Sequence, residues 1–317
     1  MVEGTEQCDD GNFDTGDECS PLCKVEPKCV NGVCEAKCGD GLKLDSEACD
    51  DGNQRNFDGC SSLCTIEPGF TGEAPNLPVV YRDFIGWDEN EPLADIGPQH
   101  KDCESSLVME PCQEVVATTL TAGKPVLVNT DGCVSGAATF ARWYRSDDTI
   151  NRTVLDTIVM SPVPGTPGAF QFEDASFDPL DGKGFNDPAA VNSLDPTVLR
   201  EHPRMGDDGP HNFGFTSELR YWFTYRGGEK LTFYGDDDVW VFINGHLAVA
   251  IPGQHPAEDR WIILGGPAGA GSTGSDSDTR DGTMYTTGIF NPVTPGLTPG
   301  GVYEVVVFQA ERHTNKS

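Results

Sequence analysis

The pattern of apolar and polar positions changes near residue 80 of the chain. Beyond that point, short runs of β-branched and aromatic residues are separated by Gly, Pro and Asp. Such runs predict short strands, so we expect a mainly β fold built as a β-sandwich. The expected strands are Val115–Leu120, Pro125–Asn129, Arg152–Met160, Glu218–Tyr225, Lys230–Tyr234, Val239–Ile243, His246–Ile251 and Val302–Ala310, with a short helix near Ala137–Tyr144.

Before residue 67 the apolar pattern is sparse, and cysteine is abundant. Nine of the twelve cysteines lie between Cys8 and Cys64, which predicts that disulfides replace a core and that the protein is extracellular or at the cell surface. We also expect Cys103 and Cys112 to close a loop, with Cys133 left over. The cysteines expected in disulfides are therefore Cys8, Cys19, Cys23, Cys29, Cys34, Cys38, Cys49, Cys60, Cys64, Cys103 and Cys112.

This first region contains an internal repeat. Cys8-Asp-Asp-Gly-Asn12 recurs at 49–53, and Cys19-Ser-Pro-Leu-Cys23 recurs in the same register as Cys60-Ser-Ser-Leu-Cys64. The second copy opens at Cys38, whose counterpart falls before Met1, so we expect the first copy to be truncated and Met1 not to be the natural start. The Asp, Asn and Gly residues predict either structural turns or Ca²⁺ loops.

Composition divides the chain into three parts and limits its partners. We expect disulfide-rich repeats over residues 1–66, a Pro- and Gly-rich linker over 67–80 and the β-sandwich over 81–317. The formal net charge of -30 disfavours nucleic acid and anionic membranes and favours cations. No apolar run approaches the roughly 20 residues that span a bilayer, so no membrane insertion is expected.

The most informative segment is Tyr234-Gly-Asp-Asp-Asp-Val-Trp-Val-Phe-Ile-Asn-Gly245. Three adjacent carboxylates, Asp236, Asp237 and Asp238, precede an apolar strand. Convergent oxygen ligands are what Ca²⁺ prefers, and the sequence indicates no counter-charge beside them. The alternative interpretation is a solvated acidic turn.

Several motifs occurring in order resemble the fibro-slime domain, a branch of the β-sandwich lectin superfamily named for the N-terminal domain of anthrax protective antigen. They span roughly residues 81–317 and are Phe140-Ala-Arg-Trp-Tyr-Arg145, Asp181-Gly-Lys-Gly-Phe185, His211-Asn-Phe-Gly-Phe-Thr-Ser-Glu218, Tyr234–Gly245 and Ala310-Glu-Arg-His-Thr314. The cysteine-rich repeats resemble those of myxobacterial surface proteins, where they serve as stalks or spacers.

The resemblance implies specific site residues. In the superfamily's lectin members, two adjacent aspartates bind Ca²⁺, which in turn holds sugar hydroxyls; by position these are Asp236 and Asp237. Asp238 then stands beside the ion. A further ligand is expected in the loop that contains Asp276 and Asp278, and Trp261 is the candidate for stacking against a sugar. This chain departs from the family at Ala250, where an acid usually stands.

No catalytic motif is present in the sequence. The six histidines lack the spacing of a zinc site, and no nucleophile elbow or phosphate loop occurs, so we expect no enzyme. His211 is expected to make structural hydrogen bonds, and Glu311 is expected to pair with Arg312. The sequence thus predicts a Ca²⁺-dependent adhesin that binds glycans or cell-surface polysaccharide. The alternatives are a fibre subunit that packs against copies of itself, and a noncatalytic module of a polysaccharide-degrading enzyme.

Overall fold

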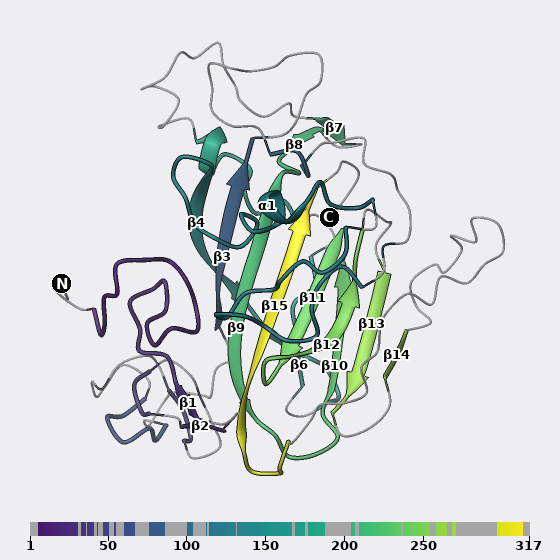
Figure 1. The fold of residues 1–317 in the computed structure, drawn as a ribbon. Coiled ribbons are helices and arrows are strands. Elements are labelled where there is room, and N and C mark those ends of the chain that lie inside the picture. Colours follow the sequence, from purple (N-terminus) through teal and green to yellow (C-terminus); the bar gives the residue numbers. More distant parts are fainter. Residues whose placement is uncertain are drawn as a thin grey trace.

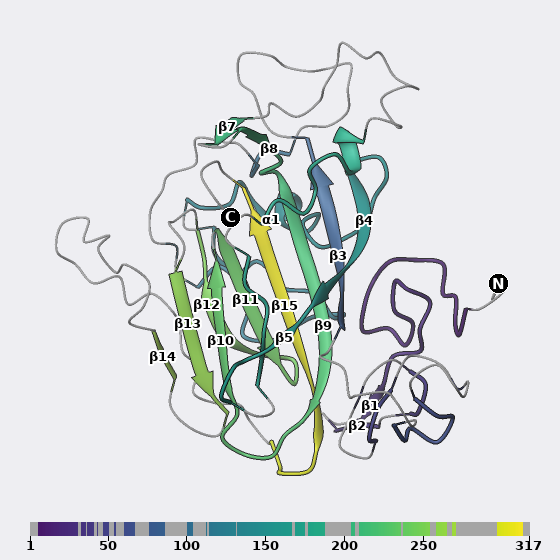
Figure 2. The same ribbon diagram turned by 180° about the vertical axis from the view of Figure 1, so that it is seen from behind.

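The structure is a computed structural model, shown from opposite sides in Figures 1 and 2. It describes residues 6–30, 33–35, 37–40, 43, 47–50, 54, 60–66, 76–85, 100–103, 112, 114–130, 132–166, 169–174, 177–187, 204–206, 209–235, 237–253, 258–264, 268–270 and 297–312. The fold is mainly β, as predicted, with a disulfide-rich region before it.

The disulfide-rich region is held by cystines, and its two copies share equivalent disulfides and bridges among the described residues. Cys8–Cys19 and Cys49–Cys60 are equivalent bonds, each with a sequence separation of 11. Isolated bridges join Cys19 to Val25 and Cys60 to Ile66, at equivalent positions of the two copies. Between the copies, β1 (Lys28–Val30) and β2 (Val33–Glu35) form a hairpin closed by Cys29–Cys34.

A six-stranded antiparallel sheet is the centre of the molecule. Its strands lie side by side across Figure 1, with the C-terminal strand β15 in the middle. In spatial order they are β12 (His246–Ile251), β11 (Asp238–Ile243), β15 (Val302–Glu311), β9 (Phe215–Thr224), β3 (Asn76–Phe84) and β4 (Asn151–Val159). The register places Glu218 opposite Phe308 and Phe308 opposite Trp240, so these three side chains share one face.

A second sheet packs against part of the large sheet and makes the fold a sandwich. It contains β10 (Lys230–Gly235), β13 (Glu258–Ile263) and β14 (Ala268–Ala270). Ile262 and Leu264 pack there against Val239, Val241 and Tyr303 of the large sheet. We call this side of the large sheet the sheet face.

The opposite side, which we call the helix face, is covered by residues 112–150. These include the one-turn helix α1 (Ala137–Phe140), which crosses in front of the sheet in Figure 1. Phe140, Trp143 and Tyr144 pack there against Trp240 and Phe308. Apolar side chains are thereby removed from water on both faces of one sheet.

The remaining elements are short. They are β5 (Ser161–Pro162), β6 (Phe170–Gln171), η1 (Gly184–Asn186), β7 (Arg204–Gly206) and β8 (Gly209–His211). In the described part of the chain, no helix is long and apolar enough to cross a membrane.

The structure corrects several predicted elements. Residues 76–80, expected in the linker, belong to β3, and β13 and β14 were not among the expected strands. Residues 115–120 and 125–129 form only isolated bridges, including Val116 to Leu127, because they lie across the helix face instead of joining a sheet.

Two disulfide predictions are also corrected. Cys112 pairs with Cys133, whereas Cys103 carries a thiol that lies 3.8 Å from His100 Nδ1. Cys23 also carries a thiol. Its counterpart in the second copy, Cys64, bonds to Cys38.

Candidate metal centre

The predicted calcium cluster lies where the chain crosses between the two sheets. β10 ends at Gly235 in the three-stranded sheet, and β11 begins at Asp238 in the six-stranded sheet. Asp237 and Asp238 are buried, with exposed fractions of 5% and 0%. Asp236 lies outside the described residues, as do Asp276 and Asp278, so their predicted roles stay predictions.

Asp238 is held by protein groups at both carboxylate oxygens. Its Oδ2 accepts a hydrogen bond of 2.6 Å from Arg312 Nε, and its Oδ1 accepts one of 2.7 Å from the backbone N–H of Gly253. Arg312 is a counter-charge that the local sequence does not indicate. Because both oxygens of Asp238 are engaged, the geometry suits a supporting position better than direct coordination of an ion.

Arg312 follows β15 directly and connects three parts of the fold. Its backbone N–H donates to Asp237 Oδ2 at 3.0 Å, and its Nη1 donates to the carbonyl of Cys133 at 2.8 Å. The guanidinium carbon also lies 4.9 Å from the centroid of the Trp143 ring. Burial acts to lower the pKa of Arg312, but Asp238 and Asp237 outweigh it and raise the pKa above its ordinary value.

A further acid orients the ring beneath Arg312. Asp102 Oδ2 accepts a hydrogen bond of 3.0 Å from Trp143 Nε1, and its Oδ1 accepts one of 2.7 Å from the N–H of Ser135. Beside it, burial lowers the pKa of His100 to about 4, although Asp102 opposes that shift. His100 is therefore neutral at pH 7 and acts as a packing group against Phe84.

The cluster has the chemistry of a hard-cation site. Asp236 and Asp237 carry carboxylates, and carboxylate oxygens suit Ca²⁺. Of the described pair, Asp238 is bonded to the Arg312 side chain and Asp237 to the Arg312 backbone.

Trp261 lies on β13, on the side of the three-stranded sheet that faces away from the large sheet. It is half-buried and alternates with the buried Ile262, and Lys230 Nζ lies 4.9 Å from the centroid of its ring. Its partner in β10 is Thr232, five positions before Asp237. At about 3.3 Å per residue, five residues of extended chain span at most roughly 16 Å between Thr232 and Asp237.

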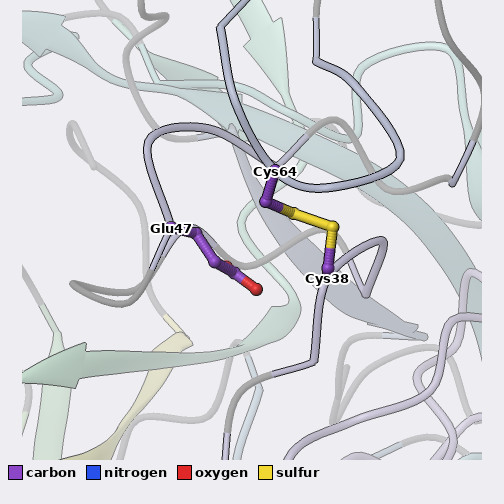
Figure 3. Close-up of side chains that lie close together, drawn as sticks. All are labelled: Cys38, Glu47 and Cys64. Atoms are coloured by element: carbon purple, nitrogen blue, oxygen red, sulfur yellow. A yellow bond between two sulfur atoms is a disulfide. The ribbon is translucent and has the colours of Figure 1, made fainter.

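Two other groups of side chains have the spacing of metal ligands. Cys38, Glu47 and Cys64 lie together in Figure 3, but the two sulfurs are joined as a disulfide and offer no thiolate. Asp178, Asp181 and His211 form the other group.

In this second group, His211 Nδ1 lies 2.6 Å from Asp181 Oδ2 and 3.4 Å from Asp178 Oδ2. The backbone N–H of Asn212 donates to Asp181 Oδ1 at 3.1 Å, and Asn212 Nδ2 donates to the buried Asp83 at 3.0 Å. These bonds tie the loop before η1 to the start of β9. The structural role predicted for His211 is confirmed.

Comparison with known proteins identifies part of the chain. Residues 25–65 match the family model described as a domain of unknown function, DUF4215. Over 131 residues the chain is 35% identical to protein psiJ of Dictyostelium discoideum. The aligned region covers 41% of this chain and 18% of psiJ. Over 193 residues it is 32% identical to protein psiD of the same organism, which covers 61% of this chain and 30% of psiD.

The chain thus carries a DUF4215 segment and is homologous in part to the Dictyostelium psi proteins. The alignment with psiD, at 193 residues, is longer than the repeat region, so it includes part of the β-sandwich. The matched parts make up less than a third of the length of psiJ and psiD. No solved structure matches the chain.

Proposed function

We propose that this chain is part of an extracellular adhesin that binds carbohydrate with the help of Ca²⁺. Asp236 and Asp237 would hold the ion, and Asp238 would support them through Arg312. One observation carries the proposal: the carboxylates of Asp237 and Asp238 are brought together and buried at the start of β11, and clustered carboxylate oxygens attract a cation. The resemblance to the fibro-slime domain supports the same pair of residues.

Two further features support an extracellular setting and a sugar ligand. The cystines of the repeat region and the Cys112–Cys133 bond belong to an oxidising compartment. Trp261 and the exposed Tyr234 lie on the outer side of the three-stranded sheet, where aromatic rings stack against sugars. We propose an oligosaccharide as the ligand, with one sugar against Trp261 and another near Asp237.

Calcium binding is tested by calorimetric titration and by melting with and without a chelator. A saturating ion that binds only the folded state stabilises it, by about 2.7 kcal/mol at a hundredfold excess over Kd. We expect chelator to lower the Tm of the wild type and to leave D236N/D237N unchanged. D148N removes one exposed carboxylate elsewhere and should behave as the wild type.

Carbohydrate binding is tested on a glycan array in Ca²⁺ and again in chelator. The proposal predicts binding that chelator and D236N/D237N both abolish, and that Trp261→Ala weakens. A wild-type protein with neither a calcium-dependent Tm nor chelator-sensitive glycan binding would rule the proposal out. Calcium-dependent melting without any glycan signal would rule out the carbohydrate part alone.

A fibre subunit is the second candidate, and one observation favours it. Among the described strands, β4 pairs only with β3, so the large sheet ends in a nine-residue edge. Val159 at the end of this edge is 61% exposed. An open edge strand accepts another strand, here from a second copy of the chain. Filaments seen by electron microscopy without any glycan would support this function over the first.

A further inference from the structure

The first cysteine-rich repeat is docked on the helix face of the large sheet. Thr15, in the loop closed by Cys8–Cys19, is only 8% exposed. Its hydroxyl donates to Glu218 Oε1 at 2.6 Å and accepts from Arg220 Nε at 3.0 Å. Two hydrogen bonds to charged partners therefore join positions that lie far apart in the chain.

The sheet offers this loop a cluster of paired charges. Glu218 is fully buried and accepts from Arg82 Nη1 at 3.0 Å and from Lys124 Nζ at 2.8 Å. Lys124 also lies 3.0 Å from Asp14 Oδ1, so the loop supplies a carboxylate to the cluster. Burial acts to raise the pKa of Glu218, but Lys124, Arg82 and Arg220 together lower it to about 2.

Gly16 lies directly against the guanidinium of Arg220. Its φ is +83°, and a Cβ at this position would lie 2.7 Å from Arg220 Cζ. Arg220 cannot easily move away, because its Nη1 pairs with Glu304 at 2.5 Å and its Nη2 donates to the carbonyl of Gly123 at 3.1 Å. Only glycine combines this backbone conformation with this contact.

The repeat itself holds the loop in its docked shape. Glu26 Oε2 accepts hydrogen bonds from the N–H groups of Gly16, at 2.6 Å, and of Asp17, at 3.1 Å. Glu26 is buried, as is Cys34 of the adjacent hairpin, which packs against Trp222 of β9. The docked surface thus extends along β9 from Glu218 to Trp222.

The second repeat carries different residues at the docking positions. When the two copies are aligned on their cysteines, Asp14, Thr15 and Gly16 correspond to Arg55, Asn56 and Phe57, although the preceding sequence Cys-Asp-Asp-Gly-Asn is identical. Arginine at the first position would face Lys124 and Arg82 with a like charge, and phenylalanine at the third would overlap Arg220.

We propose that Arg82, Lys124, Glu218 and Arg220 form a recognition site for a cysteine-rich repeat whose loop reads Asp-Thr-Gly. In this chain the site selects the first repeat and rejects the second. The first repeat is then a bound partner of the sandwich, in contrast to the stalk or spacer expected from the resemblance. This proposal is independent of calcium and of carbohydrate.

A zero-length carbodiimide cross-link read by mass spectrometry tests the docking in the full chain. In the wild type, Asp14 and Lys124 should be linked, because their charged atoms are 3.0 Å apart. Glu18 Oε1 and Lys28 Nζ are also 3.0 Å apart, and both lie in the disulfide-rich region. They provide an internal control that should be linked in every variant. X-ray scattering measures the radius of gyration of the same samples.

Two variants separate recognition from general strain. T15N/G16F gives the first loop two residues of the second copy and keeps Asp14 as reporter. We expect the Asp14–Lys124 link to fall at least tenfold and the radius of gyration to increase. G11F is the matched control, since Gly11 has a similar φ of +80° but no atom within 4 Å of an added Cβ, so it should keep the link.

The proposal would be overturned if T15N/G16F kept the Asp14–Lys124 link and the wild-type radius. It would also be overturned if G11F lost the link as completely as T15N/G16F, since strain in the loop would then explain both. Because the second copy already carries Asn and Phe at these positions, T15N/G16F should retain the Glu18–Lys28 link. The single variant T15V replaces the hydroxyl with a methyl group. It should lower the yield of the Asp14–Lys124 link without altering the loop backbone.

Discussion

Arg312 and Asp238 form a buried ion pair, 2.6 Å from Nε to Oδ2, between the end of β15 and the start of β11. Neighbouring strands are thereby joined at their ends by side chains as well as by the ladder that pairs Asp238 with Ala310. The pair also fixes the chain where it leaves the large sheet after β12, because Asp238 accepts a hydrogen bond from the N–H of Gly253.

Removing one member of this pair should destabilise the fold strongly. We expect Arg312→Met to lower the free energy of unfolding by about 3–5 kcal/mol, because Asp238 is left buried and charged without its partner. Urea unfolding measures the change. Arg312→Met/Asp238→Asn should recover part of the loss; equal losses in the single and double variants would show that the pairing is not the cause.

The stability of the chain should depend on pH through Glu26. Burial raises the pKa of Glu26 to about 7, against the lowering effects of Arg220 and the Gly16 N–H, whereas Asp17 and Glu304 raise it further. The protonated form is the one that the fold favours, so its contribution is fully present below the ordinary pKa of 4.5 and is lost as pH rises through 7. This loss amounts to about 3 kcal/mol at most.

The check is thermal or urea unfolding of the wild type and Glu26→Gln at pH 5 and pH 8. The glutamine keeps an acceptor for the Gly16 and Asp17 N–H groups but does not ionise. Glu26→Gln should therefore stabilise the protein relative to the wild type at pH 8 and have a much smaller effect at pH 5. An identical effect at both pH values would contradict the assignment.

Glu218 should act in the opposite direction at acid pH. Its pKa is depressed to about 2, so its contribution is present above the ordinary value of 4.5 and is lost as pH falls through 2. We expect acid unfolding of the wild type to begin below pH 4.5. Glu218→Gln should be strongly destabilising at pH 7, because three buried cations lose their shared partner. As the pH is lowered, the variant should then lose less further free energy of unfolding than the wild type does.

The Cys112–Cys133 bond should stabilise the segment that covers the helix face. It closes a loop with a sequence separation of 21, for which chain entropy predicts about 3 kcal/mol. Cys112→Ser/Cys133→Ser should lose about that much free energy of unfolding and expose Trp143 and Trp240, which tryptophan fluorescence reports. Cys103→Ala is the control, because it removes a buried thiol and leaves every disulfide in place. It should lower the free energy of unfolding by less.

Two glycines with similar backbone angles provide a test of the loop before η1. Gly184 (φ +61°) has the carboxylate of Asp83 where a Cβ would lie, whereas Gly165 (φ +78°) has nothing within 4 Å. Gly165→Ala should cost about 1 kcal/mol from strain alone. Gly184→Ala should cost clearly more, because Asp83 cannot move without breaking its bonds to Asn212 and to the N–H of Phe185.

The strands rich in β-branched residues could be predicted from the sequence almost to the residue. β11, β12 and β15 lie where the apolar runs placed them, because their side chains are buried on both faces. β3 was missed because Pro78 suggested a linker. Pairing with β9 begins only at Val79, so Pro78 lies where the strand has one neighbour and its missing N–H is tolerated.

The partner of the acidic cluster could not be predicted by local reasoning. From their adjacency we expected Arg312 to pair with Glu311. The Arg312 side chain bonds to Asp238, which is distant in the sequence. The sequence signal for this region was the run of carboxylates before β11. Such a run predicts a nearby cation, and the structure places the Arg312 guanidinium there.

The docked repeat also determines how the molecule would respond to tension. A pull on the first repeat would be carried by Thr15 into β9 and by Asp14 to Lys124. Those contacts are short in range, so they would rupture over a small extension. Under force, the first repeat would thus detach from the large sheet while the sandwich is still folded.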